Sequence, residues 1–241
     1  MNKVLLKSAF TVGLLTLLLS VPVFGASINK SVKVAPGAES GGETSVNGSI
    51  TVGEGATVTG GLNTVNGKIR VGDDATVENV HTVNGSVSIG SDVSAGSLET
   101  VNGSISLGEK STAAGAVEAV NGRIQLAKGS EVTEDVSNVN GDISLVGSEV
   151  GGDLSTVNGD VALSDGAVLK GDLIVEEPSS WGWSSKKSRT PEIVIGPGSR
   201  VEGVLRLERE VKLFISESAD VGGVEGVMSM DDAVRFSGDR P

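Results

Sequence analysis

The chain has 241 residues, of which 31 are acidic and 19 basic, and it contains no cysteine. Lys3 and Lys7 belong to a leader described below, and without them the chain has 17 basic and 31 acidic residues, a net charge of −14. This negative charge argues against nucleic acid and anionic membranes as partners. The missing cysteine excludes disulfides and thiol chemistry, and an aromatic content of 2% beside 35 Gly predicts a narrow core of small aliphatic side chains.

Residues 1–25 are expected to be a secretory signal peptide. Lys3 and Lys7 precede an apolar run that Gly13 and Pro22 interrupt, and small residues follow this run. A lasting transmembrane anchor needs a longer uninterrupted span, and no cysteine follows for lipid attachment. We therefore expect cleavage after Gly25 and an exported product, periplasmic or extracellular, that keeps no membrane anchor.

The tripeptide Val-Asn-Gly then recurs seven times, at steps of 19, 18, 18, 19, 19 and 18 residues. The asparagines of the repeat are Asn47, Asn66, Asn84, Asn102, Asn121, Asn140 and Asn158. Asn-Gly is typical of backbone with positive φ, so each tripeptide predicts a corner of the chain. A constant step of this size indicates a solenoid of stacked coils.

Apolar residues keep a fixed register with each asparagine. Ile or Val follows three positions later and Val, Ile or Leu five positions later, as Ile105 and Leu107 follow Asn102. This alternation predicts a half-buried strand after each corner. Asn-Gly also occurs in two-residue β-hairpins, but hairpins need matched strands on both sides of the turn, whereas here the apolar columns recur once per 18 or 19 residues.

The expected fold is therefore all-β, a parallel β-solenoid of about ten coils that spans residues 28–226. Asn29 begins a degenerate coil before the first tripeptide, and the strands at 193–196 and 212–215 continue the array. Ten coils at the ~4.8 Å spacing of neighbouring strands give a rod about 50 Å long. Residues 227–241 are expected to cap the last coil or to fray.

Stacking should place identical side chains directly above one another. We expect the Asn column to form a structural ladder of side-chain amides, each bonded to the coils above and below.

A column of Thr precedes the corners, at Thr64, Thr82, Thr100 and Thr156, which ordinary β-propensity explains better than an ice-binding array. His81, the only histidine, lies at a position of variable residue type and is expected to be exposed to solvent.

The repeats resemble those of the bactofilins, bacterial polymer-forming cytoskeletal proteins. The resemblance is carried by segments such as 69–77 (IRVGDDATV) and 193–203 (IVIGPGSRVEG), with the pattern I-x-[VI]-G-x-x-[AS]-x-V. It implies a right-handed β-helix that assembles end to end without nucleotide. Two features depart from that family: the export signal and the regular Val-Asn-Gly corner.

We expect no enzymatic activity, no cofactor and no metal. Hexapeptide acyltransferases also have 18-residue turns and a catalytic His, but their acyl-CoA substrates are cytoplasmic, which conflicts with export. Acidic corners such as 72–74 and 152–153 offer oxygen ligands for calcium, but they lack the nonapeptide pattern of calcium-binding repeats.

An insertion at 176–191 interrupts the repeat. It holds Trp181, Trp183, Lys186, Lys187 and Arg189, and thus both tryptophans and a basic cluster of an acidic chain. Loops displayed on rigid scaffolds commonly bind partners, although the tryptophans could equally fold back onto the rod.

Taken together, the repeat, the export signal and the resemblance favour an envelope scaffold that forms homo-oligomers or filaments. The alternative is an adhesin or binding module whose loop recognises a glycan, peptidoglycan or an envelope protein.

Overall fold

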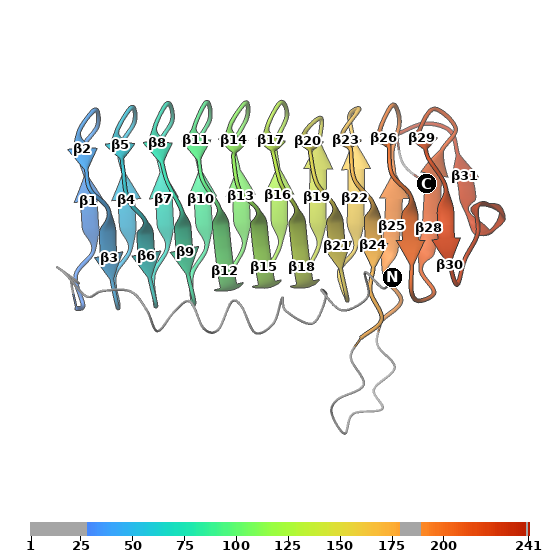
Figure 1. The fold of residues 1–241 in the computed structure, drawn as a ribbon, viewed down its shortest axis with the longest axis horizontal. Helices are drawn as coiled ribbons and strands as arrows, with labels where there is room; N and C mark the ends of the chain where they lie inside the picture. The colour runs from blue at the N-terminus through green and yellow to red at the C-terminus, as the bar shows by residue number, and fades with distance from the viewer. Residues whose placement is uncertain (1–27, 179–188, 240) are drawn as a thin grey trace, which may run out of the picture.

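A computed structural model describes residues 28–178, 189–239 and 241. It confirms the predicted parallel β-solenoid, in which successive coils lie side by side along a straight rod (Figure 1). Each coil contributes one strand to each of three sheets, so that every third strand in the chain is a neighbour in space. The signal peptide expected at residues 1–25 and the residues of the insertion from Ser179 to Ser188 lie outside the described residues.

The first sheet contains the strands that follow the Val-Asn-Gly corners. Its side chains alternate as expected, so Ile105 and Leu107 are fully covered while Ser106 between them faces outward. Its eleven strands are β1 (Val32–Val34), β4 (Ile50–Val52), β7 (Ile69–Val71), β10 (Val87–Ile89), β13 (Ile105–Leu107), β16 (Ile124–Leu126), β19 (Ile143–Val146), β22 (Val161–Ser164), β25 (Glu192–Ile195), β28 (Lys212–Ser216) and β31 (Val234–Phe236).

The second sheet consists of two-residue strands, each with one inward side chain such as Ala113 or Val132. Its strands are β2 (Glu39–Ser40), β5 (Thr57–Val58), β8 (Thr76–Val77), β11 (Ser94–Ala95), β14 (Thr112–Ala113), β17 (Glu131–Val132), β20 (Glu149–Val150), β23 (Val168–Leu169), β26 (Arg200–Val201) and β29 (Asp220–Val221).

The third sheet leads into the Val-Asn-Gly corners. Its strands are β3 (Glu43–Ser45), β6 (Leu62–Thr64), β9 (Val80–Thr82), β12 (Leu98–Asn102), β15 (Val117–Asn121), β18 (Val136–Asn140), β21 (Leu154–Thr156), β24 (Leu173–Val175), β27 (Leu205–Leu207) and β30 (Val224–Gly226). Since β24 ends at Val175 and β25 begins at Glu192, the insertion leaves and rejoins the rod between the third and the first sheet.

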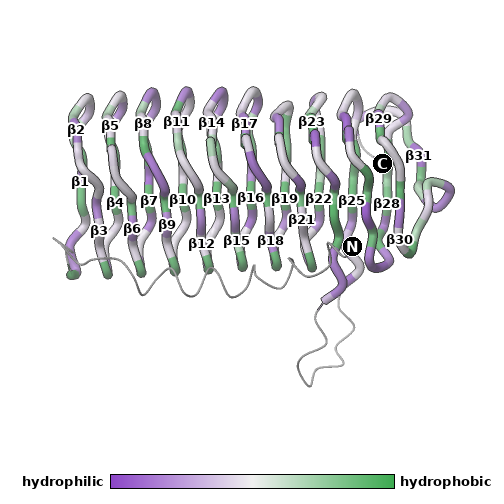
Figure 2. Tube along the Cα trace, viewed as in Figure 1, coloured by the Kyte–Doolittle hydropathy of each residue, from purple (hydrophilic) through white to green (hydrophobic). Residues whose placement is uncertain are grey.

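Pairing between coils keeps equivalent residues in register. Val87, Ile105 and Ile124 are successive partners in the first sheet, and Leu98 and Val117 are partners in the third. Apolar side chains therefore form continuous columns inside the rod, visible as green segments that recur from coil to coil in Figure 2. A single coil could not bury these residues alone, so the shared core holds the rod together.

The turn between the first and second sheets is the place where positive φ is needed. Gly55, Asp74, Asp92, Lys110 and Gly129 occupy one position of five successive coils, with φ between 56° and 72°. Gly, and less readily Asp, tolerates this conformation. The expectation that Asn-Gly supplies the positive φ was thus wrong for nearly all coils, because among the seven corner glycines only Gly141 has a positive value, 142°.

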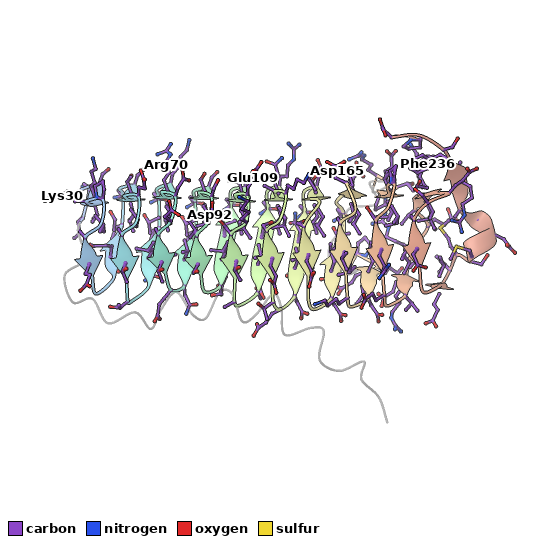
Figure 3. All side chains as sticks on the ribbon, turned by 90° about the horizontal axis from the view of Figure 1, so that it is seen from above. Lys30, Arg70, Asp92, Glu109, Asp165 and Phe236 are labelled. Carbon is purple, nitrogen blue, oxygen red and sulfur yellow. The ribbon has the colours of Figure 1, made fainter. Side chains whose placement is uncertain are left out.

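The tail continues the fold past residue 226. A 3-10 helix, η3 (Met230–Asp232), follows the last coil, and β31 pairs with β28 at the end of the first sheet. Phe236 is buried, and Met228 and Met230 pack partly buried against the core. The tail therefore covers the C-terminal end of the rod, opposite the end that carries Lys30 (Figure 3).

Candidate functional site: the Val-Asn-Gly corner and the base of the insertion

The side-chain amides at the Val-Asn-Gly corners form one continuous ladder. In each rung Nδ2 of an asparagine donates a hydrogen bond to Oδ1 of the asparagine one coil earlier. The ladder starts at Asn29 and rises through Asn47, Asn66, Asn84, Asn102, Asn121, Asn140 and Asn158, with distances from 2.6 to 3.0 Å. Asn suits this column because a single side chain supplies both a donor and an acceptor.

The backbone follows the same corner. The amide of Asn84 donates to the carbonyl of Val65 at 2.7 Å, and the amide of Asn102 to that of Val83 at 2.7 Å. Most amide side chains of the ladder are exposed, so water competes for each bond and each contributes only about 1 kcal/mol or less. The ladder therefore fixes the register of the corner more than it stabilises the fold.

Glycine follows each asparagine because the coils approach one another too closely for a side chain. A Cβ built on Gly103 would overlap the carbonyl oxygen of Gly85, and one on Gly122 would overlap that of Gly103. The same overlap with the preceding corner occurs at Gly67, Gly85, Gly141 and Gly159. The obstacle is backbone, so it cannot move aside as a flexible side chain would.

The Thr column points into the rod, where its hydroxyl groups bind the corner carbonyls. Thr64 donates to the carbonyl of Gly48 at 2.9 Å, and Thr100 to that of Gly85 at 2.9 Å. These bonds give the column a role in addition to the β-propensity expected from the sequence. A buried carbonyl needs a partner, and Thr provides one from the next coil.

The irregular positions of the Thr column meet this need in only one case. Asn138 replaces Thr and its Nδ2 donates to the carbonyl of Gly122 at 2.6 Å. Thr156 uses its hydroxyl oxygen differently, as the acceptor for the amide of Gly159 at 3.1 Å. Ala119 carries no polar group at the same register.

His81 is less exposed than expected. Its side chain is only 12% exposed, and Nδ1 lies 3.1 Å from a carboxylate oxygen of Glu99 in the neighbouring coil. His81 and Glu99 are equivalent outward-facing positions of neighbouring strands in the third sheet, and Glu118 is the equivalent residue of the next strand. Burial, together with the nearby carboxylates of Glu99 and Asp135, raises the pKa of Glu118 to about 7. The variable residue type at this position therefore did not mean free exposure.

The base of the insertion is held by side chains at the same corner. Nη1 of Arg209 donates to the carbonyl of Val157 at 3.1 Å and to Oδ1 of Asn158 at 3.2 Å, and its Nη2 donates to the carbonyl of Arg189 at 3.1 Å. Arg189, one of the five predicted loop residues, forms an ion pair with Asp160. Trp181, Trp183, Lys186 and Lys187 lie outside the described residues.

The acidic corners considered for calcium are occupied by backbone contacts. Asp73 accepts a hydrogen bond from the amide of Ser91 at 2.8 Å, and Asp153 accepts one from the amide of Asp172 at 2.8 Å. Within residues 28–178 and 189–239, no group of three or more potential metal ligands converges. The same residues contain no helix that could span a membrane.

Hollows on the described surface are shallow and lie over the first sheet. The larger, of about 550 Å³, is lined by residues such as Ser106, Gln125 and Ser144. A smaller one, of about 340 Å³, lies between Arg123, Asp160 and Glu192 beside the base of the insertion. Both are open grooves across exposed strand positions rather than enclosed sites.

Comparison with models of known protein families, with curated proteins and with solved structures found no match. The features of this chain that bear on function are therefore its fold and two features of this edge, the ladder and the base of the insertion. Sequence reasoning identified the ladder and the insertion, but it missed Arg209. The Asn column itself could have revealed it, because the column stops at Asn158 and the residue at the same position two coils later is Arg209.

Proposed function

We propose that the mature chain is a non-enzymatic structural scaffold of the bacterial cell envelope. In this proposal residues 1–25 direct export, and the rod acts in the periplasm or outside the cell without a cofactor. The observation that carries the proposal is the unbroken register of coils from β1 to β31, which makes a stiff rod rather than a scaffold for a catalytic cleft. The bactofilin-like repeats support the same class of function.

Self-assembly is part of this proposal. A coil at the end of a solenoid has unpaired strand edges to which another copy can add. We propose that the rods associate end to end, as the resemblance to bactofilins implies, although the tail covers part of the C-terminal end. Sedimentation velocity and negative-stain microscopy of residues 26–241 test this. Rods or filaments whose length grows with concentration are expected, and monomers at every concentration would contradict assembly.

A second candidate function is that of a binding module or adhesin. The observation that favours it is the base of the insertion, where Arg209 and Asp160 fix the returning end of a segment rich in Trp and Lys. Tryptophan with basic residues is a composition typical of interaction anchors. The proposed partner is a glycan or peptidoglycan of the envelope, or a protein bound to it.

Co-sedimentation with purified peptidoglycan tests the second function. The double variant Trp181→Ala/Trp183→Ala should lose most of the binding, whereas Lys68→Ala/Arg70→Ala, a change of two basic residues on a distant coil, should not. Equal binding by both variants would eliminate the loop as the binding element. Circular dichroism of each variant shows that the rod remains folded.

A further inference from the structure

The Asn ladder ends at the point where the insertion leaves the rod. The register pairs Thr156 with Val175 and Val175 with Leu207. Two positions further along, the column therefore reads Asn158, Glu177, Arg209. Neither Glu177 nor Arg209 can continue an amide ladder. Two acceptors at the last rung, the carbonyl oxygen of Val157 and Oδ1 of Asn158, therefore need another donor.

The first of these acceptors is a backbone carbonyl. In earlier coils the carbonyl before each corner asparagine receives the amide of the next corner, as Asn158 donates to Val139 at 2.9 Å. At Val157 this pattern breaks, because the amide of Glu177 donates instead to a carboxylate oxygen of Glu208 at 3.4 Å. Nη1 of Arg209 supplies the missing donor, at 3.1 Å.

The second acceptor is the last amide oxygen of the ladder. Oδ1 of Asn158 receives the same Nη1 of Arg209 at 3.2 Å, in the position where another asparagine would donate. A guanidinium carries five N–H groups in a planar fork, so it can serve several acceptors at once. Arg209 thus replaces one backbone donor and one side-chain donor.

The same guanidinium also reaches the returning end of the insertion. Its Nη2 donates to the carbonyl of Arg189 at 3.1 Å. Next to it, Asp160 pairs with the Arg189 side chain and accepts the amide of Glu192 at 2.8 Å. Side chains therefore tie the returning end of the insertion to this corner, whereas the departing end is held by the backbone, where the amide of Glu176 donates to the carbonyl of Thr156 at 2.9 Å.

We propose that Arg209 is a positioning residue that terminates the Asn ladder and fixes the returning end of the insertion 176–191 to it. Its guanidinium joins the corner at Asn158 to the carbonyl of Arg189, and so sets the place at which the chain rejoins the rod. The positioning role is independent of any partner, whereas its effect on binding rests on the second function proposed above.

Hydrogen exchange of the mature protein tests the positioning role. In Arg209→Ala the amide of Glu192, which follows Arg189 by three residues and donates to Asp160, should exchange on the order of tenfold faster, because the returning end of the insertion loses its bond to a charged donor. The amides of Ile105 and Leu107, several coils away, should not change. Arg200→Ala is the matched control, since Arg200 lies on the second sheet and pairs with Glu202 and Asp220, away from the insertion.

Arg209→Lys separates charge from geometry. Lysine keeps the charge but cannot serve three acceptors from a planar fork, so intermediate exchange is expected at Glu192. Exchange equal to wild type in Arg209→Ala, or acceleration spread evenly over the rod, would overturn the positioning role. Full restoration by Arg209→Lys would overturn the bridging of three acceptors.

Peptidoglycan co-sedimentation of the same variants tests the link to binding. Weaker binding by Arg209→Ala, with normal binding by Arg200→Ala, supports the link. Unchanged binding by Arg209→Ala together with faster exchange would refute the link to binding but leave the positioning role of Arg209 in place. Loss of binding in Trp181→Ala/Trp183→Ala is the separate test of the loop itself. A failure of the proposed binding function can therefore be told apart from a failure of the positioning role of Arg209.

Discussion

The coils before and after the insertion hold their edges together by different means. From Asn29 to Asn158 the corner carries a neutral ladder of identical amides. Beyond it the same column holds Glu177 and Arg209, and the guanidinium of Arg209 ends the ladder. Ion pairs bridge coils in both regions, as Arg123–Asp142 does before the insertion and Arg200–Asp220 after it. The difference shows that exact repetition allows a self-complementary ladder, whereas a break in the repeat needs an unlike residue to end it.

The largest expected effect comes from Gly→Ala substitutions on the two sides of the insertion. Gly103→Ala should lower the free energy of unfolding by about 3 kcal/mol or more, because its Cβ would overlap the backbone of the preceding coil. Gly223→Ala in the late coils should cost about 1 kcal/mol or less, since its nearest neighbour is a side-chain atom of Val204 at 3.6 Å. Urea unfolding measures both. Similar losses for the two variants would contradict the close approach at the corner.

A smaller loss is expected from the buried hydroxyl column. Thr100→Val keeps the shape of the side chain but removes the donor to the carbonyl of Gly85, and should cost about 1–2 kcal/mol. Thr112→Val, at an outward position of the second sheet, is the matched control and should change stability by less than about 0.5 kcal/mol. A neutral Thr100→Val would mean that water or another group satisfies the carbonyl.

The ladder and the ion pairs should respond differently to salt. Asn102→Ala and Arg206→Gln should each cost about 0.5–1 kcal/mol at low ionic strength. In 1 M salt the cost of Arg206→Gln should fall towards zero, because exposed charges are screened, while that of Asn102→Ala should persist. Unfolding at both salt concentrations measures this, and a parallel loss of both effects would remove the distinction between the ladder and the ion pairs.

A separate effect concerns pH. Because the folded protein raises the pKa of Glu118 from 4.5 to about 7, the folded state binds more protons between these values and stability falls as the pH rises through them. Glu118→Gln should therefore be more stable than wild type at pH 8, and the two should converge below about pH 4.5. Thermal unfolding across this range is the measurement, with Glu131→Gln on the second sheet as control. A constant difference at all pH values would exclude the titration of Glu118 as its cause.

The repeat made the fold and the ladder accessible from the sequence. A period of 18 or 19 residues shows which side chains are equivalent, and alternation within the strand shows which of them face inward, as at Ile105 and Leu107. Once coils stack, equivalent asparagines must lie one strand spacing apart, which is the distance that an amide ladder needs. The insertion was visible for the same reason, as the segment that the period does not explain.

What the sequence alone determined is thus the stacking of coils, the columns inside them and the place where the repeat breaks. Only the tertiary structure decided how closely the coils approach at Gly103, which buried carbonyl Thr100 serves, how far His81 is covered and which acceptors Arg209 reaches. The physical reason is that a period identifies equivalent positions, whereas steric contact and hydrogen bonding depend on the path of the backbone between coils. Arg209 illustrates this, because its partners lie 20 to 52 residues away along the chain and meet it only after the insertion has left and rejoined the rod.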